Sequence, residues 1–214
     1  KYLELTMSGW REIGIGPVGI LNAADIFQYH PCEQKDEFKC SVGFIGGYWG
    51  YKSSGLNEYI LPLCNPQYNL NVKIFGNQSW PVAQYLGNID DENAKHLFSS
   101  AKICVSVSEP HSRSLGFDCI ERPFKVMASG GFCISDYVEE FRTLFTPNEL
   151  IMYRDFDELI SLVEDFIESP EMREIHIAAG MKKTLASHTY FDRVAQMLTH
   201  LDLPDDAKRV MECK

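Results

Sequence analysis

The 214-residue sequence contains no apolar run approaching the roughly 20 residues that a membrane-spanning helix requires. Its first residues also lack the basic and apolar regions of a signal peptide. We therefore expect a soluble protein without a transmembrane segment.

Positive charge is scarce. Lysine and arginine together number 20 against 30 aspartates and glutamates, which gives a formal net charge of −10. Non-specific binding to nucleic acid or to an anionic membrane needs a positive field over the contact surface. We therefore expect no nucleic-acid partner, and any anionic ligand must meet a local cluster of cations.

Paired cysteine motifs are also absent. The seven cysteines are odd in number, none forms a C-x-x-C pair, and several fall within expected strands. This pattern is typical of reduced, buried thiols and predicts a cytoplasmic location. The spacing of His30, Cys32, Cys40 and His111 matches no zinc-binding motif, so we predict no metal site.

The length and a hydrophobic content of 45% allow one sizeable core. Short buried strands alternate with helices, which predicts an α/β fold with a doubly wound, mainly parallel, Rossmann-like sheet. We divide the chain into a lead-in segment (1–31), a Rossmann-like domain (32–201) and a polar tail (202–214). The expected strands are 41–45, 70–75, 85–87, 102–107, 132–134 and 150–153.

A G-x-G-x-x-G pattern occupies residues 14–19, and residues 20–27 could form the helix that such a loop opens. No solid buried strand precedes it, and the place for an acidic ribose ligand falls in a loop near Asp36. Three interpretations stay open: a dinucleotide-binding loop, a loop facing the active cleft, and a plain turn.

Glycine-rich loops follow the first two expected strands. Gly46 and Gly47 end the first, where backbone amides can approach a phosphate closely and Lys52 adds a charge. A surface turn is the alternative, and the G-K-[ST] ending of a Walker loop is absent. Gly76 and Asn77 end the second strand, at an edge where open α/β sheets bind ligands. Trp80 either stacks on a base or belongs to the core or a lid.

The stretch 106–136 carries the densest set of ligand-binding side chains. A buried strand leads into a polar loop, and Pro123 then suits the first turn of a helix whose free amides form an anion site. We expect this stretch to grip a phosphate. Its charged residues are Glu109, His111, Arg113 and Asp118 in the loop, followed by Glu121, Arg122 and Lys125 around the helix start.

Two later motifs indicate helix starts. Asp155 and Asp157 match the D-x-D of metal-dependent sugar transferases, but helical apolar spacing follows directly, so we predict that they cap a helix. Thr189 and Asp192 predict a capping box for a further helix.

Five segments together resemble the donor-binding half of group 1 glycosyltransferases, and most closely the CgeB-like branch, over roughly residues 25–200. They are FIGG at 44–47 with Lys52, VKIFGN at 72–77, YLG at 85–87, SSAKI at 99–103 and RPFKVMASGG at 122–131.

The resemblance implies one half of a GT-B arrangement that binds a nucleotide-diphosphate sugar such as a UDP-sugar. It places Gly46, Gly47 and Lys52 near the diphosphate, and Gly76 and Asn77 near the nucleoside. The implied activity is transfer of a hexosyl or deoxyhexosyl group to a glycan or other hydroxyl acceptor. Lys52, Arg113 and Arg122, with the helix amides, would stabilise the leaving diphosphate, so we expect neither a metal ion nor a cofactor.

The chain departs from this family in two ways. Lys125 stands where the family carries a ribose-binding glutamate. Either Asp118 or Glu121 takes that role, or the donor is held differently, or donor binding has been lost. The residues before the first strand are too few for an acceptor-binding domain, so we expect the chain to be one module of a longer protein or to work with a partner. His111 is the best candidate for the general base here, and a structural or phosphate-contacting role is its alternative.

Two other functions remain open. One is a non-catalytic module that binds nucleotide-sugars or glycans, which the Lys125 departure favours. The other is a different Rossmann-like enzyme, such as a nucleotide-sugar epimerase or a dehydrogenase that uses the loop at 14–19.

Overall fold

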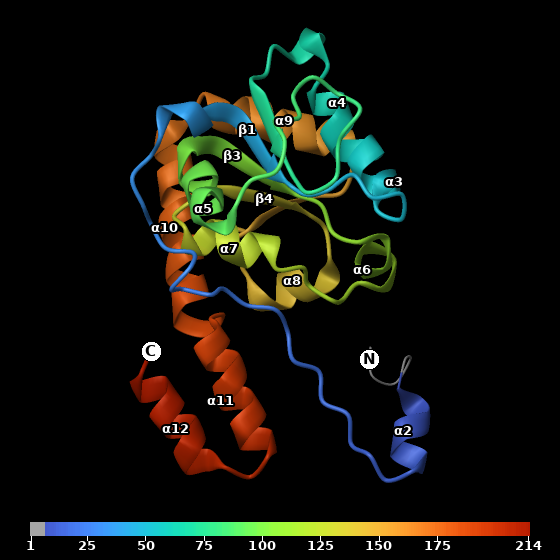
Figure 1. Ribbon diagram of the computed structural model, residues 1–214, viewed down its shortest axis with the longest axis vertical. Helices are drawn as coiled ribbons and strands as arrows, with labels where there is room; N and C mark the ends of the chain where they lie inside the picture. Colours follow the sequence, from blue (N-terminus) through green and yellow to red (C-terminus); the bar gives the residue numbers. More distant parts are fainter. Residues whose placement is uncertain (1–6) are drawn as a thin grey trace.

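The computed structural model describes residues 7–214. Five parallel strands form one sheet in the order β2-β1-β3-β4-β5 (Figure 1). The expected α/β, doubly wound parallel sheet is therefore confirmed. The strands are β1 (Cys40–Ile45), β2 (Val72–Phe75), β3 (Ala101–Ser106), β4 (Cys133–Asp136) and β5 (Ile151–Tyr153).

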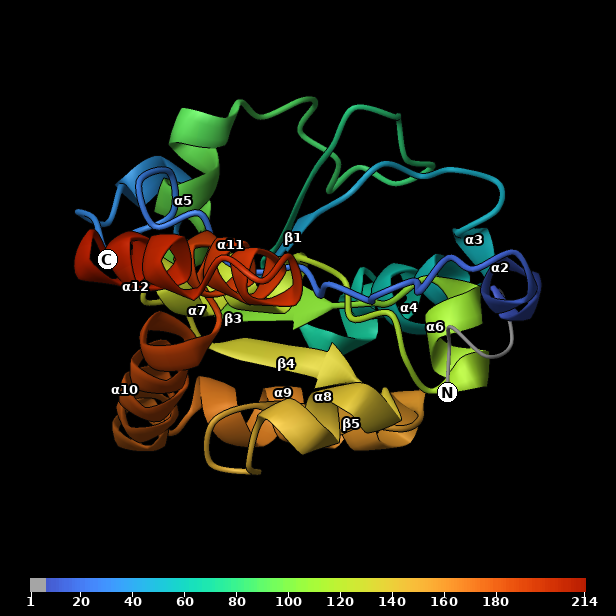
Figure 2. The same ribbon diagram turned by 90° about the horizontal axis from the view of Figure 1, so that it is seen from below.

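Helices cover both faces of this sheet (Figure 2). One core lies under α5 (Asp91–Ser100), α7 (Arg122–Ala128) and α8 (Glu139–Leu144). The other lies under the segment 53–63 and α9 (Phe156–Ile167). The segment 53–63 comprises α3 (Ser53–Gly55), the π-helix η2 (Leu56–Ile60) and α4 (Leu61–Leu63). The remaining helices are α2 (Ser8–Glu12), η1 (Asp36–Phe38), η3 (Pro66–Tyr68), α6 (Pro110–Leu115), α10 (Pro170–Ser187), α11 (Tyr190–His200) and α12 (Pro204–Glu212).

The strands are mostly apolar because the sheet is covered on both sides. In β3, Ile103 and Val105 face one core, whereas Cys104 between them faces the other. All seven cysteines are free, and four of them are buried. No helix within residues 7–214 has the length and the apolar character needed to span a bilayer.

Both predicted helix caps are confirmed. The Asp155 carboxylate accepts from the backbone N–H of Glu158 at 2.8 Å and starts α9. Thr189 and Asp192 form the expected capping box at the start of α11. Asp155 of the D-x-D motif therefore acts as the N-cap of α9.

Two expectations about local structure are wrong. Residues 85–87 form no strand, because Tyr85 closes a turn onto Val82 and makes only one bridge with Ile74, and Gly87 has a φ of 99°. The expected polar tail is mostly the helix α12, which packs against α11 and buries Ala207. Its polar composition concealed a helix with acidic residues in its first turn.

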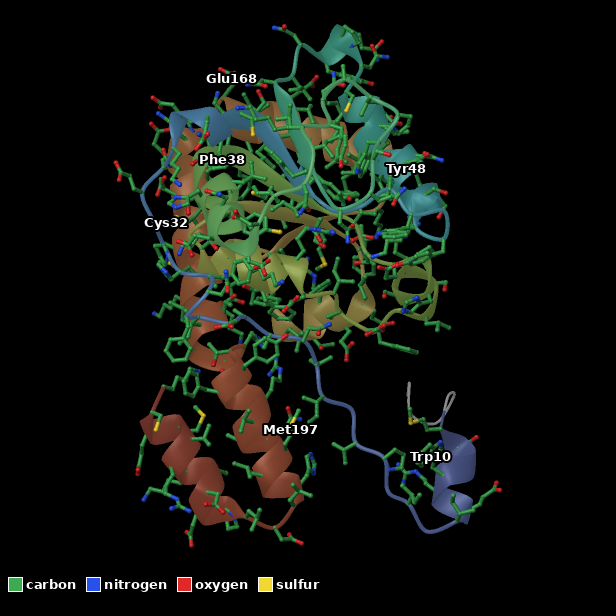
Figure 3. The ribbon with its side chains drawn as sticks, in the orientation of Figure 1. Trp10, Cys32, Phe38, Tyr48, Glu168 and Met197 are labelled. Atoms are coloured by element: carbon green, nitrogen blue, oxygen red, sulfur yellow. The ribbon has the colours of Figure 1, made fainter. Side chains whose placement is uncertain are left out.

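Residues 1–6 of the expected lead-in segment lie outside the described residues. Its described residues comprise an arm that carries α2 and a part around Ala24 that pairs with the domain. The arm that carries α2 extends away from the sheet, as does the α11–α12 hairpin; Figure 3 labels Trp10 and Met197 on them. Ala24 belongs to the domain, since its N–H donates to the His188 carbonyl and its carbonyl accepts from the Tyr190 N–H.

The glycine pattern at 14–19 does not form a dinucleotide loop. Residues 20–27 contain no helix, only an isolated bridge at Ala24. A Cβ atom added at Gly14 or Gly16 would have nothing within 4 Å. The interpretation as a dinucleotide loop that opens a helix is therefore wrong, whereas the cleft-facing loop and the plain turn both remain open.

Candidate functional site

A cavity of about 250 Å³ opens beyond the carboxyl ends of β1 and β3. It collects many of the predicted phosphate-binding residues, as expected for features that follow parallel strands. Its wall combines Gly46, Gly47 and Lys52 after β1, Val107, Ser108 and Glu109 after β3, Glu121, Arg122 and Lys125 around the start of α7, and the side chains of Tyr29, Ile89, Asp91, Ala94, Phe98 and Ile120.

Arg122 joins the ends of the two central strands at this cavity. Its Nε donates to the Ile45 carbonyl at 2.9 Å, and its Nη1 donates to the Val107 carbonyl at 3.2 Å. The guanidinium also lies 4.7 Å from the centre of the Phe44 ring. Two backbone carbonyls and one aromatic face therefore hold the cation in place.

The charge of Arg122 has no close counter-ion. Arg122 forms no ion pair within residues 7–214 and is only partly exposed. Burial lowers the pKa of its guanidinium, with distant acids such as Asp136 opposing the effect. A partly buried cation that binds only neutral carbonyls favours an anionic ligand.

Lys52 lies at the same cavity and forms an ion pair with Glu109. Glu109 Oε2 is buried and has no hydrogen-bond partner in the described chain. The sequence analysis assigned Glu109 to the polar loop without a separate role. Its position just after β3 could have indicated that it lines the cavity. Its unpartnered oxygen can accept from a hydroxyl group of a ligand.

Lys125 and Glu121 form a second ion pair at 2.7 Å. Lys125 Nζ also lies 4.7 Å from the centre of the Tyr29 ring. Burial lowers the pKa of Lys125, but Glu121 and Tyr29 outweigh it, so the net pKa is raised and the ammonium stays charged. Both lysines of the cavity are therefore paired with glutamates in this structure.

Apolar side chains line the part of the cavity next to α5. Ala94 and Phe98 are buried there, and Ile89 and Ile120 lie beside them. The Tyr29 hydroxyl donates to Asp91 Oδ1 at 3.2 Å in the same region. The sequence did not predict this region, because no motif singles out Asp91 and Tyr29 lies in the expected lead-in segment.

Gly76 and Asn77 support the glycine loop rather than line the cavity. A side-chain atom on Gly76 would lie 2.4 Å from the Gly46 carbonyl oxygen, and one on Gly47 would lie 2.6 Å from Asn77 Oδ1. Gly76 and Asn77 therefore pack closely on the glycine loop, and their contact with a nucleoside stays a prediction.

Trp80 is also a supporting residue. Its ring is buried against Phe44 with the centroids 5.5 Å apart, and its Nε1 donates to the Gly46 carbonyl at 2.8 Å. Both contacts anchor the glycine loop from below. The core interpretation is confirmed, and stacking of Trp80 on a base is excluded by its burial.

His111 and Asp118 pair with each other outside the cavity wall. Their Nε2 and Oδ2 atoms are 2.7 Å apart, and the two side chains are 50% and 44% exposed. Asp118 has a φ of 72°, and its N–H donates to Glu140 at 2.9 Å. The short helix α6 carries His111 outward, which the sequence did not predict. Asp118 is thus not a wall residue of the nucleoside region.

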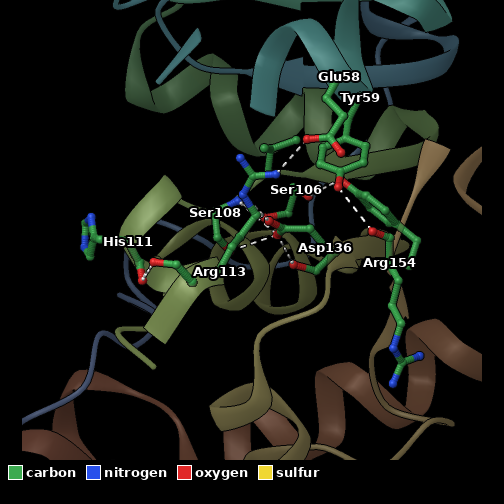
Figure 4. A network of polar contacts seen from close by, with 12 residues as sticks. Glu58, Tyr59, Ser106, Ser108, His111, Arg113, Asp136 and Arg154 are labelled. Carbon is green, nitrogen blue, oxygen red and sulfur yellow. Dashed lines mark hydrogen bonds and ion pairs between the residues drawn. The ribbon is translucent and has the colours of Figure 1, made fainter. Parts of the chain in front are cut away.

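Arg113 belongs to a network below the cavity (Figure 4). Its Nη1 donates to Glu58 at 3.1 Å, and its Nε lies 3.9 Å from Asp136 Oδ2. Asp136 is buried and accepts from the N–H and the hydroxyl of Ser108, which does line the cavity. Burial raises the pKa of Asp136, and Ser108 and Arg113 oppose that shift. Arg113 therefore supports the cavity wall from outside it, and its role as a phosphate ligand stays a prediction.

No group of three or more histidine, cysteine, aspartate or glutamate side chains within residues 7–214 is arranged to hold a metal ion. The cavity instead combines three cations, three carboxylates and an apolar region. Such a set can bind a ligand that carries negative charge, hydroxyl groups and a flat ring.

Three solved structures with this fold are each longer than the chain. Sucrose-phosphate synthase from Thermosynechococcus elongatus matches with a TM-score of 0.67 at 13% identity, over 94% of this chain and 56% of that chain. A DNA-modifying β-glucosyltransferase, studied with and without its substrate uridine diphosphoglucose, matches with a TM-score of 0.60 at 17% identity, over 87% of this chain and 54% of that chain. T4 phage BGT, in complex with its UDP-glucose substrate, matches with a TM-score of 0.59 at 15% identity, over 94% of this chain and 54% of that chain.

These likenesses show the fold, a Rossmann-like half of the GT-B arrangement, and the chain spans about half the length of each match. Comparison with curated proteins finds no match. A family model described as glycosyl transferase-like matches residues 58–199, which is most of the described domain and includes α7. On this match, the chain belongs to the glycosyl transferase-like family.

Proposed function

We propose that this chain is the donor-binding part of a glycosyltransferase that moves a sugar from a nucleotide-diphosphate sugar to a glycan or another hydroxyl acceptor. The observation that carries the proposal is the unpaired Arg122 guanidinium at the cavity between the ends of β1 and β3. A diphosphate bound here would accept charge-assisted hydrogen bonds from the guanidinium, which otherwise donates only to neutral backbone carbonyls.

The donor would lie along the cavity with its diphosphate near Arg122, Lys52 and the backbone of Gly46 and Gly47. Its base would occupy the apolar region beside Phe98. This orientation places the most polar part of the donor against the cations and the flattest part against apolar side chains. The structures of UDP-glucose-binding relatives support UDP as the first nucleotide to test.

Negative charge grows on the nucleoside diphosphate as the bond to the sugar breaks. Lys52 and Arg122 would stabilise that charge in the transition state, so the proposed reaction needs no metal ion. The Lys52–Glu109 pair must open for Lys52 to reach the phosphate. Glu109 would then accept hydrogen bonds from hydroxyl groups of the transferred sugar, hexosyl or deoxyhexosyl.

The acceptor side of the reaction lies outside this cavity. We propose that an acceptor-binding domain completes the enzyme, because the matched structures contain about as much chain again. His111 is the proposed general base, held by Asp118 in one orientation on the exposed helix α6. Free cysteines throughout the domain support a cytoplasmic site of action.

Ligand binding and turnover test this proposal together. Thermal unfolding is measured with UDP, GDP, dTDP and NAD, and donor hydrolysis is then measured with UDP-glucose and GDP-mannose. We expect stabilisation by a nucleoside diphosphate and slow release of sugar. Stabilisation by NAD alone would overturn the proposal.

One observation favours a second candidate, a module that binds nucleotide-sugars without turnover. Both cavity lysines are neutralised by glutamates, and Lys125 takes the place of the expected glutamate. Such a protein would bind a nucleoside diphosphate in the thermal assay but release no sugar from any donor, even in the presence of acceptor glycans.

A further inference from the structure

The geometry points to Tyr190 as a positioning residue for donor binding, which acts by holding Glu121 toward the ribose hydroxyl groups of the donor. This inference rests on the proposed nucleotide-sugar site. Tyr190 starts α11, far along the chain from the strands that build the cavity, and it does not line the cavity itself.

Glu121 is held from two sides. Its Oε1 accepts from the Tyr190 hydroxyl at 2.9 Å, and its Oε2 lies 2.7 Å from Lys125 Nζ. Each carboxylate oxygen keeps a further lone pair for another donor. The carboxylate is therefore oriented before a ligand arrives, which lowers the entropy cost of binding.

The position of Glu121 matches the middle of a nucleoside diphosphate. Arg122 follows it directly and faces the proposed phosphate position, whereas Ile120 precedes it and lines the apolar region. The ribose joins those two parts of the donor, and its vicinal hydroxyl groups donate hydrogen bonds. Lys125 cannot accept them, because an ammonium group has no acceptor, so Glu121 is the matching partner.

The backbone around Tyr190 is firmly placed. Its N–H donates to the Ala24 carbonyl at 3.0 Å, and Tyr190 lies between Thr189 and Asp192, the two residues of the capping box. Burial, followed by the bond to Glu121, raises the pKa of the Tyr190 hydroxyl, so it stays protonated and acts as the donor. The ring lies in an apolar groove with Phe191, so a phenylalanine at this position keeps the packing.

The test compares Tyr190→Phe with the wild type by calorimetry, using UDP, 2′,3′-dideoxy-UDP and pyrophosphate as ligands. The variant should weaken UDP binding by about threefold, the size expected for one exposed hydrogen bond, and should leave the other two dissociation constants unchanged. A merely structural role would weaken all three ligands together.

The matched control is Tyr68→Phe, which removes the hydroxyl of a tyrosine that packs on Phe156 outside the cavity. It should leave UDP binding unchanged. Glu121→Gln should weaken UDP binding by a smaller factor in the Tyr190→Phe variant than in the wild type, because both substitutions act on the same ribose contact. Unchanged UDP binding by Tyr190→Phe overturns this inference, whereas a wild-type protein that binds none of the three ligands overturns the proposed function.

Discussion

Ser108 donates both its backbone N–H and its hydroxyl to the buried carboxylate of Asp136, at 2.9 and 2.8 Å. The contact ties the loop after β3, which lines the cavity, to the end of β4. The same carboxylate lies 3.9 Å from Arg113 Nε. One buried anion therefore determines where the polar loop leaves the sheet.

Replacing that anion should unfold the domain more easily. We expect Asp136→Ala to lower the free energy of unfolding by about 3 kcal/mol, because it leaves the buried Ser108 N–H and hydroxyl without their acceptor and removes the carboxylate near Arg113. Urea denaturation measures the loss. Asp165→Ala, at an exposed position on α9, is the control, and an equal loss there would contradict the assigned role.

The close contact between strand ends gives a second prediction. Gly76→Ala should destabilise the protein by roughly 1–3 kcal/mol and weaken UDP binding, since the added carbon would lie 2.4 Å from the Gly46 carbonyl oxygen and push the glycine loop outward. Gly50→Ala has nothing within 4 Å and should change neither quantity. Equal behaviour of the two variants in denaturation and calorimetry would refute the packing argument.

Acid should destabilise the protein through His188. Burial, followed by the Arg193 charge, lowers the pKa of His188 from 6.5 to about 4. Between pH 6.5 and pH 4, His188 is therefore protonated in the unfolded chain but neutral in the folded protein. The free energy of unfolding consequently falls as the pH falls through this range. The loss reaches about 3 kcal/mol.

Urea denaturation between pH 7 and pH 4 measures this loss. The imidazole ring lies 4.8 Å from the Phe145 ring centroid, so His188→Gln costs packing at every pH but should flatten the slope. His200→Gln, at an exposed position on α11, is the control and should keep the wild-type slope. A His188→Gln slope equal to that of the wild type would show that other groups cause the pH dependence.

Metal removal provides the next prediction. Because Lys52 and Arg122 are proposed to carry the charge of the leaving group, EDTA should leave donor hydrolysis within about twofold of its untreated rate, and added Mg²⁺ or Mn²⁺ should not raise it further. Loss of most activity with EDTA and its recovery with Mn²⁺ would contradict a metal-independent reaction.

Features that directly follow a strand were predictable from the sequence. Gly46, Lys52 and Arg122 meet at one cavity because parallel strands bring their carboxyl ends to a single edge of the sheet. The caps at Asp155 and Thr189 follow equally from local patterns, since each depends on residues close in the chain.

Other site features depend on tertiary packing that local patterns do not encode. Tyr29 and Tyr190 reach the site from the two ends of the chain, and only the pairing of Ala24 with the start of α11 brings them there. His111 and Asp118 lie outside the cavity wall because α6, a helix of six residues, turns this segment outward. The spacing of apolar residues does not predict a helix as short as α6.

The central claim is that Arg122 and Lys52 bind the diphosphate of a nucleotide-sugar, and calorimetry with UDP tests it most directly. Lys52→Met should raise the dissociation constant by about 10- to 100-fold, as expected for a charge-assisted contact, and Arg122→Met should act in the same direction with its fold checked by circular dichroism. Lys182→Met, which removes an exposed charge on α10, should leave the constant unchanged. An unchanged UDP affinity in Lys52→Met and in folded Arg122→Met would contradict the proposed site.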